Sequence, residues 1–131
     1  MHSEPRVMPA IRRISSGGLF EARVGYCRAV VAGGVVYVAG TTAQGENIPA
    51  DVVGQCRSAL STIGAALAEA GASFADVVRV VYYLPDHREF DACWPVLAET
   101  FGDNPPAATM IEAALIDPRY RIEIEVTAHL P

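Results

Sequence analysis

Two short runs of β-branched residues flank a pair of glycines in the first third of the chain. Residues 28–38 read RAVVAGGVVYV, with Gly33 and Gly34 at the centre. A two-residue turn that matches the twist of a β-hairpin needs a positive φ at both central positions, and glycine adopts that conformation without steric cost. The segment therefore predicts a β-hairpin, which commits this part of the chain to a sheet.

The segment after the hairpin predicts an amphipathic helix from residue 50 to residue 70, followed by Gly71 as its C-terminal cap. Its apolar residues recur at steps of three and four and so form one buried face; they are Val53, Cys56, Leu60, Ile63, Leu67 and Ala70. A shorter stripe predicts a second helix that is kinked at Pro95 and ends at Gly102. Its apolar residues are Phe90, Trp94, Leu97 and Phe101.

Strongly β-prone segments supply the remaining elements. Residues 76–84 (DVVRVVYYL) predict a buried strand, and residues 107–116 and 121–130 predict two closing strands joined by a turn at Asp117-Pro118. The predicted order is β-β-β-α-β-α-β-β, an α+β domain with two helices on one face of a mixed sheet. Because two helices cover only one face, the other is expected to face water or another subunit, and its half-apolar pattern favours a subunit interface. Residues 1–10 are expected to be a flexible lead-in, and residues 11–131 a single domain.

The charged residues and cysteines narrow the possible functions. All 10 basic residues are arginines, against 15 acidic residues, for a net charge of -5. The lack of lysine excludes a protein Schiff base, a lysine-linked pyridoxal cofactor and a Walker A loop. The negative charge argues against nucleic-acid and anionic-membrane partners. Three widely spaced cysteines indicate neither a disulfide framework nor a zinc cluster, which favours a reducing cytoplasm.

Several short motifs resemble, in their order and spacing, the Rid (YjgF, reactive-intermediate deaminase) family. They are Gly25-Tyr26 before the hairpin, Gln55, Ala70-Gly71-Ala72-Ser73 with Asp76-Val77-Val78, Asp86, Phe90, and Ile122-Glu123-Ile124-Glu125 with Ala128. The match runs from about residue 11 to residue 131. It implies a chorismate-mutase-like fold and a homotrimer with a central barrel, with a small-molecule cleft between each pair of subunits. It also implies hydrolysis of imines and enamines such as 2-aminoacrylate to 2-keto acids and ammonia, without metal or cofactor.

The resemblance also implies roles for individual residues. Tyr26 matches a cleft tyrosine, Gly40 matches a glycine whose backbone N–H binds the substrate carboxylate, and Glu123 matches a glutamate that positions water. Glu123 is therefore the expected general acid and base. The alternative for Glu123 and its neighbour Glu125 is a structural ion pair with an arginine, Arg119 or Arg121.

One departure from the family pattern affects which substrate the chain is expected to bind. The family's deaminases carry Pro-Ala-Arg where this chain reads Pro106-Ala107-Ala108, so Ala108 holds the position of the arginine that binds the substrate carboxylate. Each charge-assisted hydrogen bond of such a pair contributes about 1.5–3 kcal/mol, so the substrate is expected to differ. Thr109 and Met110 follow in the cleft, and Trp94 replaces an asparagine common in the family.

Arg28 is a second departure, because it replaces a glutamine that is common in the family. It is expected on the same strand face as Tyr26, either as a relocated anion binder or in a surface or interface salt bridge. The sequence thus predicts an atypical, cofactor-independent imine or enamine hydrolase. The alternative is a non-catalytic trimeric protein that binds a metabolite or regulates a partner, and endoribonuclease activity is less favoured by the net charge.

Overall fold

The predicted hairpin is present in the computed structural model, which describes residues 10–131. It consists of β2 (Ala29–Ala32) and β3 (Val35–Thr41), with φ of +57° at Gly33 and +78° at Gly34. The helical segment predicted at 50–70 is α2 (Val52–Ala70), which begins after Asp51 and ends at Gly71, where φ is +92°. The expected lead-in falls almost entirely on residues 1–9, which lie outside the described residues.

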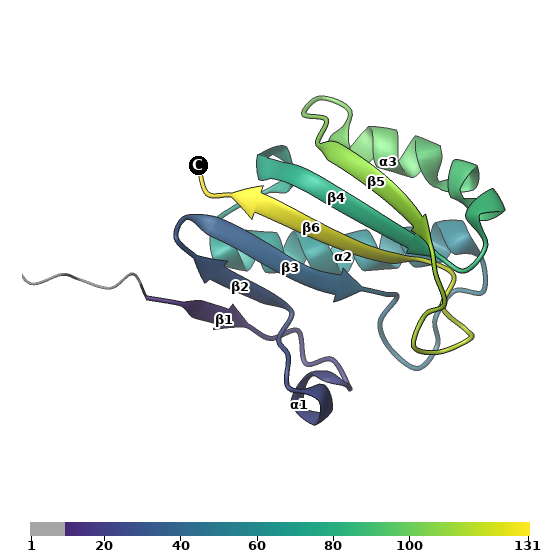
Figure 1. Cartoon of the computed structure of the whole chain (residues 1–131), viewed down its shortest axis with the longest axis horizontal. Helices are drawn as coiled ribbons and strands as arrows, with labels where there is room; N and C mark the ends of the chain where they lie inside the picture. The colour runs from purple at the N-terminus through teal and green to yellow at the C-terminus, as the bar shows by residue number, and fades with distance from the viewer. Residues whose placement is uncertain (1–9) are drawn as a thin grey trace, which may run out of the picture.

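The sheet has six strands in the order β1-β2-β3-β6-β4-β5 (Figure 1). The other strands are β1 (Arg12–Ile14), β4 (Val77–Leu84), β5 (Ala107–Glu112) and β6 (Glu123–His129). The pair β4–β5 is parallel and all other pairs are antiparallel, so the predicted mixed sheet is confirmed. The last two strands are not joined by a tight turn: β5 ends at Glu112, and residues 113–122 lead past β4 to β6.

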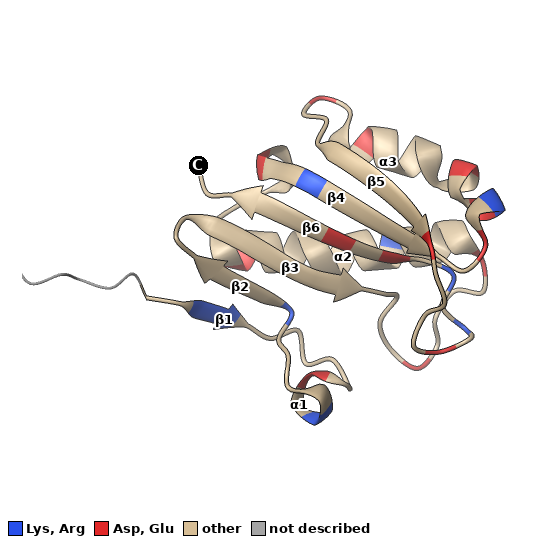
Figure 2. Ribbon diagram, viewed as in Figure 1, with Lys and Arg blue, Asp and Glu red and all other residues tan. Residues whose placement is uncertain are grey.

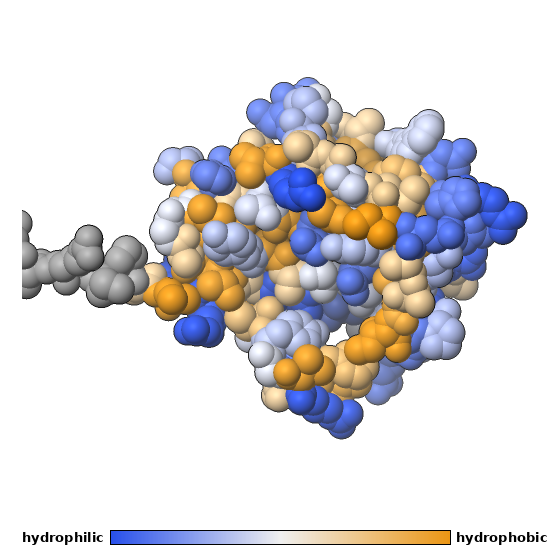
Figure 3. Space-filling model, in the orientation of Figure 1, coloured by the Kyte–Doolittle hydropathy of each residue, from blue (hydrophilic) through white to orange (hydrophobic). Residues whose placement is uncertain are grey.

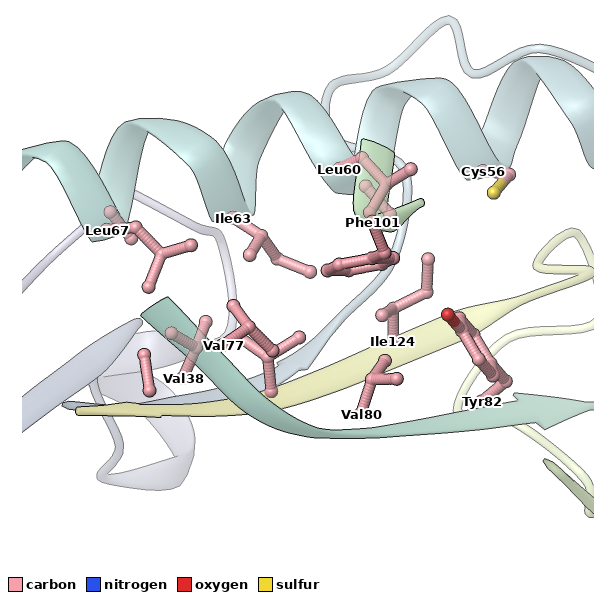
Figure 4. Close-up of a cluster of buried hydrophobic side chains, with 14 of the residues drawn as sticks. Val38, Cys56, Leu60, Ile63, Leu67, Val77, Val80, Tyr82, Phe101 and Ile124 are labelled. Carbon is pink, nitrogen blue, oxygen red and sulfur yellow. The ribbon is translucent and has the colours of Figure 1, made fainter. Parts of the chain in front are cut away.

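Both longer helices, α2 and α3 (Trp94–Phe101), cover one face of the sheet, as predicted (Figure 1). Figure 4 shows Leu60, Ile63 and Leu67 of α2 pointing toward the sheet, where they meet Val80 and Ile124. The opposite face is toward the viewer in Figures 1 and 2, and Figure 2 marks acidic positions on β6 and a basic position on β4. Because Glu123, Glu125 and Arg79 alternate with core residues along their strands, their side chains lie on this uncovered face. Among residues 10–131, no helix has the length and apolar character to span a bilayer.

The predicted second helix is wrong in its extent. Phe90 lies in a 3₁₀ helix, η2 (His87–Cys93), and α3 begins only at Trp94. Pro95 occupies the first turn of α3, where its missing N–H costs no helical hydrogen bond, so it starts the helix instead of kinking it. Trp94 is 59% exposed and does not belong to the core. Gly102 has a right-handed φ of -57° and is not a left-handed cap.

Three short helical segments are the remaining secondary-structure elements of residues 10–131. They are α1 (Glu21–Val24), η1 (Phe74–Asp76) and η2. The sequence did not predict α1, which ends at Gly25 with a φ of +85°. Together with the loop before it, α1 forms a lobe beside the end of the sheet (Figure 1), and this lobe contributes to the site described below.

The fully buried side chain of Gln55 connects α2 by hydrogen bonds to the segment between β5 and β6. Its Nε2 donates to the carbonyls of Pro49 (2.8 Å) and Arg119 (2.9 Å), and its Oε1 accepts from the Arg121 N–H (2.8 Å). One amide side chain therefore satisfies three backbone groups from two loops, which sets the course of residues 113–122.

We expect Gln55→Glu to lower the free energy of unfolding by about 1–3 kcal/mol, because a carboxylate cannot donate to two carbonyls and is buried as a charge. Urea denaturation measures the change. The matched control is Ala65→Glu, which adds the same charge at an exposed position of α2 and should change stability by no more than about 0.5 kcal/mol. Equal effects of the two substitutions would contradict this role of Gln55.

Candidate functional site

A cavity of about 850 Å³ lies where the end of β3 approaches the lobe that carries α1. Three segments line it: residues 16–28, residues 39–46 after the middle of β3, and residues 116–123 before and at the start of β6. Figure 3 shows a hollow between this lobe and the body of the molecule. Four residues singled out from the sequence line the same cavity; they are Tyr26, Arg28, Gly40 and Glu123.

An irregularity in β3 brings Gly40 against Glu123. Val38 pairs with Val126 and Thr41 pairs with Ile124, so β3 has one residue more than β6 over this stretch. Such a bulge bends a strand and redirects its neighbours. A Cβ added at Gly40 would lie 2.6 Å from Oε2 and 2.9 Å from Cδ of Glu123. The carboxylate of Glu123 therefore packs directly on the Gly40 backbone, and only glycine permits this approach.

Arg28 lies at the base of the cavity and is only 2% exposed. Its Nη1 donates to the carbonyl of Gly40 (2.9 Å) and to Oγ1 of Thr41 (2.8 Å). Its Nη2 donates to the hydroxyl of Tyr26 (3.3 Å), and the guanidinium lies 5.5 Å from the centre of the Tyr26 ring. No ion pair within residues 10–131 involves Arg28. The expected surface salt bridge is therefore wrong, because the side chain is buried and its partners within the described chain are neutral oxygens. A salt bridge to another subunit stays a prediction.

A buried carboxylate that the sequence analysis did not predict is connected to Arg28 through Ser16. Glu21 of α1 is 6% exposed and accepts hydrogen bonds from Oγ of Ser16 (2.8 Å) and from the Gly18 N–H (2.6 Å). Burial raises the pKa of Glu21, but these hydrogen bonds outweigh it and hold the pKa below its ordinary value. Ser16 also accepts from Nε of Arg28 (3.3 Å) and so links the two charges. The only sequence signal was an acid after a loop of serines and glycines, residues 15–18.

Glu123 is half-buried, and its environment raises its pKa above the ordinary value of 4.5. Burial is the main cause, the negative charge of Glu125 adds to it, and the positive charge of Arg28 opposes it. The alternative ion pairs with Arg119 and Arg121 are wrong. Arg119 pairs with Asp117 and Arg121 with Glu89, while Glu125 accepts a hydrogen bond from the Tyr83 hydroxyl (2.8 Å).

The raised pKa of Glu123 predicts a pH-dependent stability. A carboxyl whose pKa is higher in the folded state favours folding while it is protonated, and this contribution is lost as the pH rises through the folded-state pKa. The free energy of unfolding of the wild type, relative to Glu123→Gln, should therefore fall as the pH rises from below 4.5 and level off above the raised value. Urea denaturation of both proteins from about pH 4 to about pH 8 measures this difference. A difference that rises with pH would contradict the assignment.

The other three predicted site residues lie elsewhere in the chain. Ala108, Thr109 and Met110 belong to β5, the edge strand, and line none of the cavity within one chain. Ala108 pairs with Val80, so it lies on the helix-covered side of the sheet together with Met110, whereas Thr109 lies on the uncovered side. Within one chain, these three residues therefore do not share the cavity with Glu123.

A second cavity and one acidic cluster lie outside this site. The second cavity, of about 510 Å³, is lined mainly by prolines and by the paired Arg121 and Glu89, and holds none of the predicted site residues. Within the described part of the chain, the one group with the spacing of metal ligands is Asp86, His87 and Glu112. It is on the surface, and its side chains are occupied with one another and with Arg88.

Comparison with known proteins extends over nearly the whole chain. The family model described as Endoribonuclease L-PSP matches residues 18–130. A RutC family protein of Pyrococcus horikoshii is 35% identical over 108 residues, which cover 79% of this chain and 86% of that protein. A 2-iminobutanoate/2-iminopropanoate deaminase of Capra hircus is 32% identical over 123 residues, 90% of each chain. A crystal structure of a YjgF family member from Mycobacterium tuberculosis superposes with a TM-score of 0.85 at 43% identity, covering 92% of this chain and 100% of that one.

The mixed sheet, its two covering helices and the cavity at its end define a chorismate-mutase-like α+β protein. The chain belongs to the YjgF family, the Rid proteins whose family model is described as Endoribonuclease L-PSP. The family resemblance inferred from short motifs is thereby confirmed.

Proposed function

We propose that the chain hydrolyses an imine or enamine of a small molecule in the 850 Å³ cavity, with Glu123 as the proton carrier. The observation that carries the proposal is the convergence of four residues in that cavity: a half-buried carboxylate, the glycine on which it packs, a buried cation and a tyrosine hydroxyl. The similarity to a 2-iminobutanoate/2-iminopropanoate deaminase supports the reaction class.

The chemistry needs a proton carrier and a water molecule. Glu123, as the carboxylate, accepts a proton from water while the water oxygen bonds to the imine carbon. This proton passes to the nitrogen and gives a carbinolamine. Glu123 then accepts the proton of the new hydroxyl group and passes it to the same nitrogen as the C–N bond breaks, which releases ammonia and leaves a carbonyl group. The raised pKa of Glu123 suits both steps, because a general acid and base works best when its pKa approaches the ambient pH.

The substrate is expected to carry a larger apolar substituent than a short 2-imino acid does. Ala108 leaves the position of the family's arginine without charge. At the rim of the cavity, Leu19, Val24 and Ile116 are all more than 60% exposed. These apolar side chains offer contact area to a hydrocarbon substituent, since burying apolar surface contributes roughly 25 cal/mol per Å².

We further propose that the site is completed in a homotrimer. The edge strand β5 is largely exposed on both sides, including Ile111, and so offers a surface to a second copy. Light scattering of the purified protein should give a mass about three times the 13.9 kDa of one chain. A monomeric mass would contradict a cleft built between subunits.

The test of the function is ammonia release from imines generated in solution by oxidation of 2-amino acids, measured above the spontaneous rate. Release that depends on the protein supports hydrolysis. A ligand that binds at one equivalent per chain and is not converted would instead support the binding-protein alternative, which the loss of arginine at Ala108 favours. RNA cleavage is not part of the proposal, because the chain carries a net charge of -5.

A further inference from the structure

We propose that Arg28 binds the acidic group of the substrate and thereby takes over a role that the position of Ala108 no longer fills. The inference rests on the proposed function for the reaction, but anion binding by Arg28 can be measured without turnover. It names a specificity-determining residue that lies on the β2–β3 side of the site and not on β5.

The hydrogen-bond partners of Arg28 leave one donor unused. A guanidinium has five N–H groups in a planar fork. Nε donates to Ser16, Nη1 donates to Gly40 and to Thr41, and Nη2 donates to Tyr26. The second N–H of Nη2 has no acceptor among residues 10–131. This nitrogen is the one that contacts Tyr26, which lines the cavity.

Arg28 also lacks, among residues 10–131, a negatively charged partner that would compete with a bound anion. Every atom to which it donates belongs to a neutral group, and it takes part in no ion pair within the described chain. Two carboxylates lie near Arg28: Glu21, which is reached through Ser16, and Glu123, which lines the same cavity. A buried cation without a direct counter-ion favours an approaching carboxylate, which can accept a charge-assisted hydrogen bond from the one unused N–H of Nη2.

Gly40 connects the proposed anion site to the proton carrier. Its carbonyl accepts from Nη1 of Arg28 (2.9 Å), and the Glu123 carboxylate packs against the place where its Cβ would be. In a 2-imino acid the reacting carbon is bonded directly to the carboxylate. Arg28 and Glu123 line the same cavity, so one 2-imino acid can contact Arg28 with its carboxylate and Glu123 with its reacting carbon.

The experiment compares the binding of 2-oxobutanoate, the expected product of 2-iminobutanoate hydrolysis, with that of its uncharged methyl ester. Calorimetric titrations use the wild type, Arg28→Gln and the control Arg57→Gln. Arg28→Gln keeps an amide donor but removes the charge, whereas Arg57→Gln removes the same charge from an exposed position of α2. We expect Arg28→Gln to weaken binding of the acid by about 10-fold or more, to change binding of the ester little, and Arg57→Gln to change neither.

Two further measurements test the inference, and the first uses the wild type alone, so it does not depend on the folding of Arg28→Gln. The Nε–Hε resonance of Arg28 in the wild type should shift when 2-oxobutanoate is added and not when the ester is added. Adding Ala108→Arg to Arg28→Gln should restore binding of the acid. Equal binding of the acid by wild type and a folded Arg28→Gln, no preference of the wild type for the acid, or an unshifted Arg28 resonance would each overturn the inference. Binding of the acid through Arg28 without any ammonia release would overturn the hydrolase proposal alone.

Discussion

Glu123→Gln is expected to slow imine hydrolysis by about 10²- to 10⁴-fold, the range in which general acid–base catalysis contributes. Glutamine has nearly the same shape as glutamate, so the packing against Gly40 remains, but it cannot accept a proton from water. Steady-state ammonia release measures the loss of turnover, and titration with the product 2-oxobutanoate shows whether the cavity still binds.

The control for this substitution is Glu125→Gln. Glu125 lies on the same strand two residues away, accepts a hydrogen bond from Tyr83 and does not line the cavity. It acts on the reaction only by raising the pKa of Glu123, so its removal should change turnover far less than the loss of Glu123. Turnover by Glu123→Gln at the wild-type rate would show that another group carries the proton.

Gly40→Ala has the second-largest expected effect. Its methyl group would lie 2.6 Å from the nearer oxygen of Glu123, so either the carboxylate or β3 must move. Gly40 is not among the glycines with positive φ, so the strain comes from this contact and not from the backbone. Because the clashing atoms are the end of a flexible side chain, we expect a loss of no more than about 1 kcal/mol of stability, and a fall in turnover of at least about 10-fold as the carboxylate is displaced.

A double-mutant cycle separates the contact from any general weakening of β3. Glu123→Ala removes the atoms that the new methyl group would meet. If the contact is the cause, Gly40→Ala will cost markedly less stability in the Glu123→Ala background than in the wild type. The same cost in both backgrounds, measured by urea denaturation, would show that Gly40 is needed for another reason.

The fold was predictable where the local sequence pattern of an element and its burial in the core indicate the same secondary structure. The Gly33-Gly34 hairpin, the capped α2 and the alternation along β6 all appear as predicted, because each pattern has one compatible geometry. The second helix was misjudged because the spacing of its apolar residues did not reveal that Pro95 begins α3. The path from β5 to β6 depends on the tertiary contacts of Gln55, which no local pattern shows.

The site was predictable only in part. Tyr26, Gly40 and Glu123 were found through the family resemblance, and the structure brings them into one cavity. The burial of Arg28 was beyond prediction, because a lone arginine before a strand has the same sequence signature at a surface as at the base of a cavity. Glu21 was missed for the same reason.

The most direct test of the central claim is the rate of imine hydrolysis by the wild type and by Ala108→Arg under identical conditions. The substrates are 2-aminoacrylate and bulkier imines generated in solution. The proposed mechanism uses Glu123 and the cavity that Arg28 lines, so the wild type should release ammonia above the spontaneous rate without an arginine at position 108. A wild type that is inactive on every imine, with activity gained only in Ala108→Arg, would contradict this function and identify a family cleft adapted to binding another ligand.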